Sequence, residues 1–577
     1  MNPEALQDTR SMLQPILLLV ISVVLFLYYG CRKPKGYPPG PGWWPILGSS
    51  WEVSRLRRTT GSLYRTCTAL YEKYGPVVGL KIGKDRIVVL NSYESVRAMM
   101  SNEDCDGRPT GPFYETRTWG ERRGVLLTDG PLWLEQRRFV LRHLREFGFG
   151  RTDMAILIED EASHLVEHIK ALLLGAAAER EVEVGSRSKS RPTNDGRIYR
   201  LAGQRDKEDL APEEDSRGEV GEATRSLKIE DVYVKAEDYA EVRRMAQSSG
   251  TILSMDDIFG VPVLNSLWRM MAGKRFSTDD KRMIYLQKIL TKLLKKVDMV
   301  GCLFSHFPIL RYVAPEMSGY RRFVDTHQQL WAFFDAELQS HKTTIESETP
   351  RDLMDSYLNI LRSENYNETF SESQLLAICM DLFMAGSETT SKALSFSFLY
   401  FVLYPNVQRK AQEEIDLVVG RDRFPALTDR PRLPYIDAIV LESVRMFMGR
   451  TFSIPHRAVR DTQIMGYRIP KDTMIIANFN TVLMGEFWGD PEVFRPERFL
   501  NEDGKVTIPD RYLPFGFGKH RCMGEMLAKS NMFVIISALL QAFTFSVVPG
   551  EEKPPIDIVD GVTPYPKPYR VLISLRS

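Results

Sequence analysis

The sequence predicts a mainly α-helical protein with a small β-rich region, and three observations support this prediction. Most of the chain places apolar residues at helical spacing. Residues from about 75 to 92 instead resemble two strands joined by a turn at Gly83-Lys84-Asp85, and short strand-like pieces recur near 473–477 and close to the C-terminus. With 577 residues, 43% of them hydrophobic, the chain can bury a large core in one domain.

The first segment is apolar enough to cross a membrane. No charged residue occurs from Ser11 through Cys31, and a helix of this length covers the roughly 30 Å hydrocarbon core of a bilayer. A cleaved signal peptide is the alternative, but no small-residue cleavage site follows the apolar run. Three cations within residues 32–35 outnumber Arg10 on the other side, which favours a cytosolic main domain. We therefore predict an uncleaved membrane anchor over residues 1–31.

Two further segments differ from the predicted main domain of residues 46–577. Residues 32–45 form a basic and proline-rich hinge, whose Pro-Pro-Gly-Pro-Gly run at 38–42 cannot continue a helix. From about 175 to 250 the composition shifts to charged residues, serine and glycine, with few apolar residues to offset the entropy of ordering. We predict a disordered surface insertion there, and a partner-binding segment is the alternative.

Overall composition argues against several classes of protein. The formal net charge of +1 gives no indication of nucleic-acid binding. The six cysteines are scattered and include no CxxC pair, which argues against a disulfide framework and a zinc site.

One cysteine stands in a distinctive loop, residues 515–524, which reads Phe-Gly-Phe-Gly-Lys-His-Arg-Cys-Met-Gly. Gly516 and Gly518 allow a tight turn that can closely approach a flat cofactor. Peptide N–H groups, the preceding cations and a helix starting near Glu525 would all favour the Cys522 thiolate. A thiolate of this kind can bind haem iron, whereas an ordinary buried cysteine needs none of these features.

The loop resembles the haem-binding loop of the cytochrome P450 superfamily, with His520 where arginine is usual. This resemblance implies the cytochrome P450 fold, with haem b bound by the axial thiolate of Cys522 and with Phe515 in the cofactor-binding loop. It extends over nearly the whole chain except the charged insertion. It is closest to the microsomal family-2-like enzymes of animals, and most like an insect lineage.

A long apolar helix is predicted between Ser371 and Leu403. Ser371 and Gln374 have capping-box spacing, and Pro405 marks the end. The segment is apolar on nearly all faces, so the helix should run through the interior over roughly 45–50 Å. A second membrane span is the alternative, but charged residues at 381, 388 and 392 interrupt it.

The middle of this predicted helix reads Ala-Gly-Ser-Glu-Thr-Thr over residues 385–390. Glu388 and Thr389 place a carboxylate beside a hydroxyl, a pair that can relay protons from solvent. A helix kink with polar residues facing a water pocket is the alternative. With Cys522 present, the stretch resembles the oxygen-activation motif of the superfamily, which makes Glu388 and Thr389 the predicted catalytic residues.

Further residues are predicted to bind the haem propionates. Trp133 and Arg137 lie four residues apart on one helix face, where both can reach an anion, although an ordinary surface helix is the alternative. The resemblance adds Arg108, His456 and His520 as partners.

Three more residues are predicted to lock the fold. Glu442 and Arg445 can pair across one helical turn, and Arg498 can complete the network. The resemblance assigns this network a structural role behind the haem. Related chains commonly have a proline three residues after Arg445, where this chain has Met448.

The resemblance implies a membrane-bound monooxygenase that inserts one oxygen atom from O₂ into a lipophilic small molecule. Because the chain has no flavin or nicotinamide motif, electrons would come from NADPH through a separate cytochrome P450 reductase. The implied location is the endoplasmic reticulum membrane, in contact with membrane lipid, with a cytosolic catalytic domain. In that orientation the glycosylation sequon at Asn367 stays unused.

Two other functions remain open on the sequence alone. A haem-thiolate isomerase or dehydratase shares the cysteine loop but needs no electron partner, and a non-catalytic haem-binding or interaction protein needs no turnover. The substrate is equally open between a hormone-type lipid and a foreign compound.

Overall fold

The computed structural model describes residues 30–188, 250–345, 349–363 and 366–576, together with five positions between 18 and 28. Most of the predicted anchor and most of the charged insertion lie outside these residues. Within them, no helix combines the length and the apolar character needed to span a bilayer. The chain forms two compact units, Met1–His168 with Ile252–Ile573, and Ile169–Thr251 with Ser574–Ser577. The predicted site residues all belong to the first unit.

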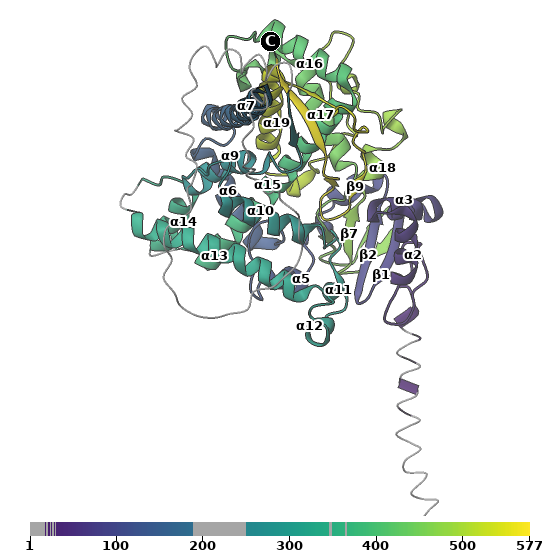
Figure 1. Cartoon of the computed structure of the whole chain (residues 1–577). Coiled ribbons are helices and arrows are strands. Elements are labelled where there is room, and N and C mark those ends of the chain that lie inside the picture. Colours follow the sequence, from purple (N-terminus) through teal and green to yellow (C-terminus); the bar gives the residue numbers. More distant parts are fainter. Residues whose placement is uncertain are drawn as a thin grey trace, which may run out of the picture. The chain divides into compact units, whose positions relative to one another are not determined.

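The first unit is mainly helical, as predicted (Figure 1). Its central element is α15 (Glu372–Leu403), which contacts α9 (Gly260–Ala272), α13 (Tyr320–Thr344), α17 (Pro434–Met448) and α19 (Glu525–Ala542). The remaining helices are α2 (Ser50–Thr60), α3 (Leu63–Tyr74), α4 (Tyr93–Met100), α5 (Pro112–Thr116), α6 (Gly130–Glu146), α7 (Thr152–Ser188, whose second half belongs to the second unit), α10 (Lys281–Leu294), α11 (Leu303–His306), α12 (Leu310–Val313), α14 (Leu353–Arg362), α16 (Pro405–Val418) and α18 (Phe479–Leu483).

A four-stranded sheet with the order β1-β2-β7-β4 forms the largest β region. β1 (Val77–Ile82) and β2 (Asp85–Leu90) pair antiparallel around a two-residue turn, which confirms the predicted hairpin. β7 (Met474–Ala477), also predicted as a strand, pairs parallel with β2. β4 (His456–Arg457) pairs antiparallel with β7. Because His456 lies opposite Ile475 at the edge of this sheet, its position is set by the strand register.

Three smaller sheets complete the β structure of the described residues. β5 (Thr462–Ile464) pairs with β6 (Tyr467–Ile469), and β9 (Ile558–Val559) pairs with β10 (Tyr565–Pro566). β3 (Thr251–Ser254), β11 (Arg570–Leu575) and β8 (Phe543–Ser546) form a sheet in that order.

The interior of the fold contains a buried ion-pair network. Arg445 donates to both carboxylate oxygens of Glu442, at 2.7 and 2.9 Å, and Arg498 donates to the same carboxylate at 3.1 Å. All three side chains are buried. This confirms the predicted three-way network, and removing one partner would leave a buried charge uncompensated. Just beyond it, α17 continues to Met448, three residues after Arg445, and Gly449 is its C-cap.

The predicted start of α15 is confirmed, with one difference. The Ser371 hydroxyl accepts from the backbone N–H of Gln374 at 3.1 Å, which is half of a capping box. The other half, a hydrogen bond from the backbone N–H of Ser371 to the Gln374 side chain, is not formed in the described structure. The Gln374 side chain accepts from the N–H of Gly124 at 3.0 Å and donates to the carbonyl of the same residue at 3.2 Å. The polar side chain therefore holds a neighbouring loop against α15, because that loop has backbone groups to satisfy.

Candidate active site

The cysteine loop has the tight geometry that its glycines predict. Gly516 and Gly518 have φ angles of 74° and 72°, which L side chains rarely adopt. A Cβ on Gly518 would lie 2.5 Å from the carbonyl oxygen of Met100, so the loop also needs glycine for close packing. The N–H of Cys522 donates to the carbonyl of Phe515 at 2.9 Å and closes the loop. α19 then begins at Glu525, where the sequence predicts it.

Opposing effects act on the Cys522 thiol. Although the residue is exposed, the protein packed around its sulfur raises the pKa of the thiol above the usual value. Backbone hydrogen bonds from Gly524 and Glu525 and the positive charge of Arg137 lower that pKa and offset part of the rise. The N-terminus of α19 thus contributes donors to the sulfur, as expected.

Three of the predicted cofactor-binding rings lie together beside this loop. The His520 ring lies 4.2 Å from the Trp133 ring and 5.2 Å from the His456 ring, between centroids. His520 Nε2 donates to the carbonyl of Asp106 at 2.8 Å. Burial, with the charge of Arg108, lowers the pKa of His520 to about 3, so the ring is neutral at pH 7. His520 therefore supplies a packing surface there but no positive charge.

Two arginines complete the cluster and supply its charge. Arg108 is buried and donates through Nη1 to the carbonyl of Pro455 at 2.9 Å, next to His456. Arg137 donates through Nη2 to the carbonyl of Arg521, next to Cys522, at 2.7 Å. Burial lowers the pKa of Arg108 to about 10 and also lowers the pKa of Arg137.

The cluster fits an anionic cofactor. In the described part of the chain, neither arginine forms an ion pair, and Arg108 Nε is a buried donor without a hydrogen-bond partner. A buried guanidinium without a carboxylate is costly unless an anion neutralises it. The propionate groups of haem have the required charge and bidentate geometry. The residues present therefore suit haem.

The second predicted region, in the middle of α15, has a less expected arrangement. Glu388 is buried, and its carboxylate accepts hydrogen bonds from the hydroxyls of Thr291 on α10 and Tyr565 on β10, the latter at 3.2 Å. Burial raises the pKa of Glu388, while Lys392 and the two hydroxyls counteract the rise. The Glu388 carboxyl group therefore binds a proton more readily than an exposed glutamate does.

Thr389 lies on another face of α15. Its hydroxyl donates to the carbonyl of Ala385 at 2.7 Å, an i−4 bond that leaves the side chain partly exposed. In the described structure Glu388 and Thr389 share no hydrogen bond, because consecutive helical residues point about 100° apart. The expected proton-relay pair is thus adjacent in sequence but not joined directly through its side chains.

Sequence reasoning missed the residues that position these groups. Thr291 and Tyr565 hold Glu388 from elements roughly 100 and 180 residues distant, so no local pattern identifies them. Asp381, which interrupts the apolar face of α15, accepts from buried Arg117 and from the N–H groups of Val125 and Leu126 at 2.7 and 2.9 Å. A charged residue in an otherwise apolar turn of the helix was the available signal for the contact between Asp381 and Arg117.

Fold and site together define a haem-thiolate protein. A family model described as "Cytochrome P450" matches residues 38–179 and 226–573, and the chain belongs to this family. The unmatched residues between 179 and 226 fall within the segment that the sequence sets apart as an insertion. Members of the family are monooxygenases that use haem with an axial cysteine thiolate, so this protein is an enzyme of that type.

Similar proteins cover nearly the full chain. "Probable cytochrome P450 303a1" of Drosophila melanogaster is 40% identical, covering 97% of this chain and 99% of the relative. "Farnesoate epoxidase" of Bombyx mori is 30% identical, covering 97% and 98%. "Cytochrome P450 2L1" of Panulirus argus is 29% identical, covering 97% and 99%. These relatives agree with the predicted resemblance to insect and family-2-like enzymes.

Proposed function

We propose that this protein is a membrane-associated monooxygenase whose haem iron is bound by Cys522 and whose haem propionates are bound by Arg108, Arg137 and Trp133. His456 and His520 pack beside these groups, and Phe515 closes the cysteine loop. The observation that carries the proposal is the convergence of the Cys522 loop with two arginines that lack ion-pair partners in the described residues. When bound, a thiolate-ligated haem activates O₂ for insertion into a substrate.

The chain's own residues would handle protons during this reaction. Glu388 can hold a proton, since burial raises its pKa. The Thr389 hydroxyl, bonded to the Ala385 carbonyl, is the acceptor and donor on the accessible face of α15. Transfer between the two needs an intervening water or a rotation of the Glu388 side chain away from Thr291 and Tyr565.

Membrane association is supported by two exposed apolar segments that flank one turn. Trp44, Ile46, Leu47 and Trp51 are exposed, and so are Leu303, Ile309, Tyr312, Val313 and Met317. The N–H groups of Gly83 and Lys84 donate to the carbonyls of Leu47 and His306, so the β1–β2 turn joins the two segments. An exposed apolar surface of this kind suits a lipid interface. The proposed location is the endoplasmic reticulum membrane, with the catalytic unit cytosolic.

The electron donor would be a separate NADPH-dependent reductase, since the chain has no flavin or nicotinamide motif. Of the basic residues near the cysteine loop, Lys519 and Arg521 pair with Glu103 and Glu525, whereas Arg138 is exposed. We propose a lipophilic small molecule as substrate. One relative is named for its action on farnesoate, which favours a hormone-type lipid over a foreign compound.

The first test is the reduced carbon monoxide difference spectrum of the full-length protein beside Cys522→Ser. We expect a strongly red-shifted Soret band in the wild type and none in the variant, because serine cannot supply a thiolate. A folded wild type without this band, or a variant that retains it, would refute Cys522 as ligand. Product formation that proceeds without NADPH and reductase would instead indicate an isomerase or dehydratase.

A further inference from the structure

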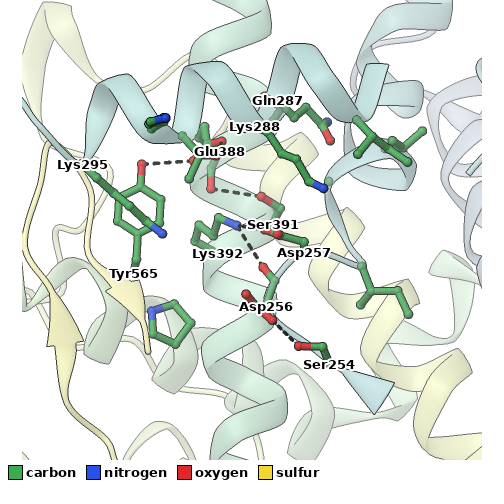
Figure 2. A pocket seen from close by; sticks show the side chains of 18 of the residues that line it. Ser254, Asp256, Asp257, Gln287, Lys288, Lys295, Glu388, Ser391, Lys392 and Tyr565 are labelled. Carbon is green, nitrogen blue, oxygen red and sulfur yellow. Dashed lines mark hydrogen bonds and ion pairs between the residues drawn. The ribbon is translucent and has the colours of Figure 1, made fainter. Parts of the chain in front are cut away.

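A cavity of about 580 Å³ lies on the Glu388 side of α15 (Figure 2). Its lining comes from α10, α15, β10 and the segment around residues 254–261, together with His168 on α7 and Thr278, and it includes none of the proposed haem-binding residues. From α15 it receives Ser387, Glu388, Ser391 and Lys392, but not Thr389. The cavity is therefore separate from the proposed haem site.

One wall of this cavity is a row of lysines. Lys288, Lys292 and Lys295 follow one another at spacings of four and three residues, which places them on one face of α10 and its C-terminal cap. None of the three forms an ion pair within the part of the chain that the structure describes. Lys295 lies over the Tyr565 ring, 4.7 Å from its centroid, and Lys288 extends from α10 into the cavity (Figure 2). Three cations thus face one space without carboxylate partners.

The carboxylates of the cavity are already engaged. Asp257 pairs with Lys392 at 3.0 Å, and Asp256 accepts from the Ser254 hydroxyl at 2.6 Å. Glu388 accepts from two hydroxyls, and burial favours its neutral form. With four lysines against three carboxylates, the lining carries excess positive charge.

A further donor lies in the same wall. Gln287 Nε2 is buried and has no hydrogen-bond acceptor among the described residues. Its side chain packs against Gly260, where a Cβ would lie 2.4 Å from Gln287 Oε1. The amide is therefore held at the wall of the cavity, and an unsatisfied buried donor favours a ligand that accepts from it.

We propose that this cavity binds a small polyanion bearing phosphate or carboxylate groups, held by Lys288, Lys292 and Lys295 with the Gln287 amide as an additional donor. Its volume admits a molecule the size of pyrophosphate or citrate. Thr291, the partner of Glu388, lies on the same helix face between the lysines. A bound anion would thus lie next to the hydrogen-bond network of Glu388, a position suited to regulating turnover.

The test is isothermal titration calorimetry of the full-length haem-loaded protein with sodium pyrophosphate and, separately, sodium citrate. Wild type is compared with Lys288→Gln/Lys292→Gln and with the control Lys281→Gln/Lys296→Gln. The control removes the same charge from exposed lysines in and just after α10 that do not line the cavity. The reduced carbon monoxide spectrum verifies folding, and the single variants Lys288→Gln and Lys292→Gln replace the double variant if it fails this check.

We expect at least one anion to bind wild type and control equally, and to bind the cavity variant about tenfold more weakly or worse, since two charge-assisted hydrogen bonds are lost. The better ligand distinguishes phosphate from carboxylate chemistry. Equal affinity in all three proteins, or no binding to wild type at concentrations of about 10 mM, would overturn the proposal. Either result leaves the proposed monooxygenase function intact, because the haem spectrum is measured independently.

Discussion

The cysteine loop and the middle of α15 both carry predicted catalytic-site residues, yet different parts of the molecule determine their geometry. In the loop, two left-handed glycines and the bond from Cys522 to Phe515 set the backbone within eight residues. In α15, Glu388 and Thr389 are neighbours in sequence, but their side chains have separate partners. Thr291 and Tyr565, from α10 and β10, decide where Glu388 points.

This difference shows how much a motif can be trusted. A motif that encodes a turn specifies its own geometry, because φ angles are a property of the residues in the turn. A motif that encodes two side chains on a helix specifies only their residue types and spacing. The network that each side chain joins depends on the elements packed around the helix.

The largest effect is expected from Gly518→Ala, which tests whether the loop is locally encoded. Alanine would require both a positive φ and a shift of the Met100 carbonyl, so the free energy of unfolding should fall by about 1–3 kcal/mol beyond the φ cost alone. The thiolate band should be lost or greatly reduced. Thermal unfolding and the reduced carbon monoxide spectrum measure both effects.

Gly504→Ala is the matched control for that variant. Gly504 has a φ of 73°, but a Cβ there would meet nothing within 4 Å. Its cost should be only the roughly 1 kcal/mol of the left-handed conformation, with an unchanged spectrum. Similar losses in both variants would mean that close packing on Met100 does not matter.

Glu388→Gln should lower the rate of product formation by about 10²-fold, since an amide keeps the shape but cannot carry the proton. The carbon monoxide spectrum should not change, because Cys522 is unaffected. Thr389→Val, assayed in parallel, should lower turnover without changing the pH dependence that belongs to Glu388. Full activity in Glu388→Gln would show that the α15 carboxylate plays no part in proton transfer.

The smallest effect is expected from Tyr565→Phe, which removes one donor to Glu388. That donor stabilises the ionised carboxylate, so its loss should raise the pKa of Glu388, which burial already raises. The limb of the pH–rate profile due to Glu388 should therefore move to higher pH by about half a unit to one unit.

Tyr569→Phe provides the control for Tyr565→Phe. Tyr569 donates at 2.5 Å to the carbonyl of Ser395, which lies on α15 like Glu388, but Tyr569 has no hydrogen bond to Glu388 in the described structure. Removing the Tyr569 hydroxyl should leave the Glu388 limb of the pH–rate profile at the same pH. A limb that moves equally in both variants, or in neither, would remove Tyr565 from the network.

Much of the fold followed from the sequence. The β1–β2 hairpin, the strand β7, the helix α15 with its Ser371 cap and the Glu442–Arg445–Arg498 network were all predicted. The Gln374 side chain was the exception at the cap, because it satisfies the Gly124 backbone instead. The Arg117–Asp381 clamp was not predicted at all, since its partners are 264 residues apart.

The sequence by itself determined the family, the cysteine loop and the residue types of the proposed haem site, because turns, caps and helical periodicity are local properties of the chain. Only the tertiary structure decided that His520 is neutral, that Arg108 and Arg137 lack ion pairs among the described residues, and that Glu388 faces a lysine-lined cavity. The charge and direction of these side chains depend on their burial and on partners from distant elements. Burial and these partners exist only once the chain has packed into its tertiary structure.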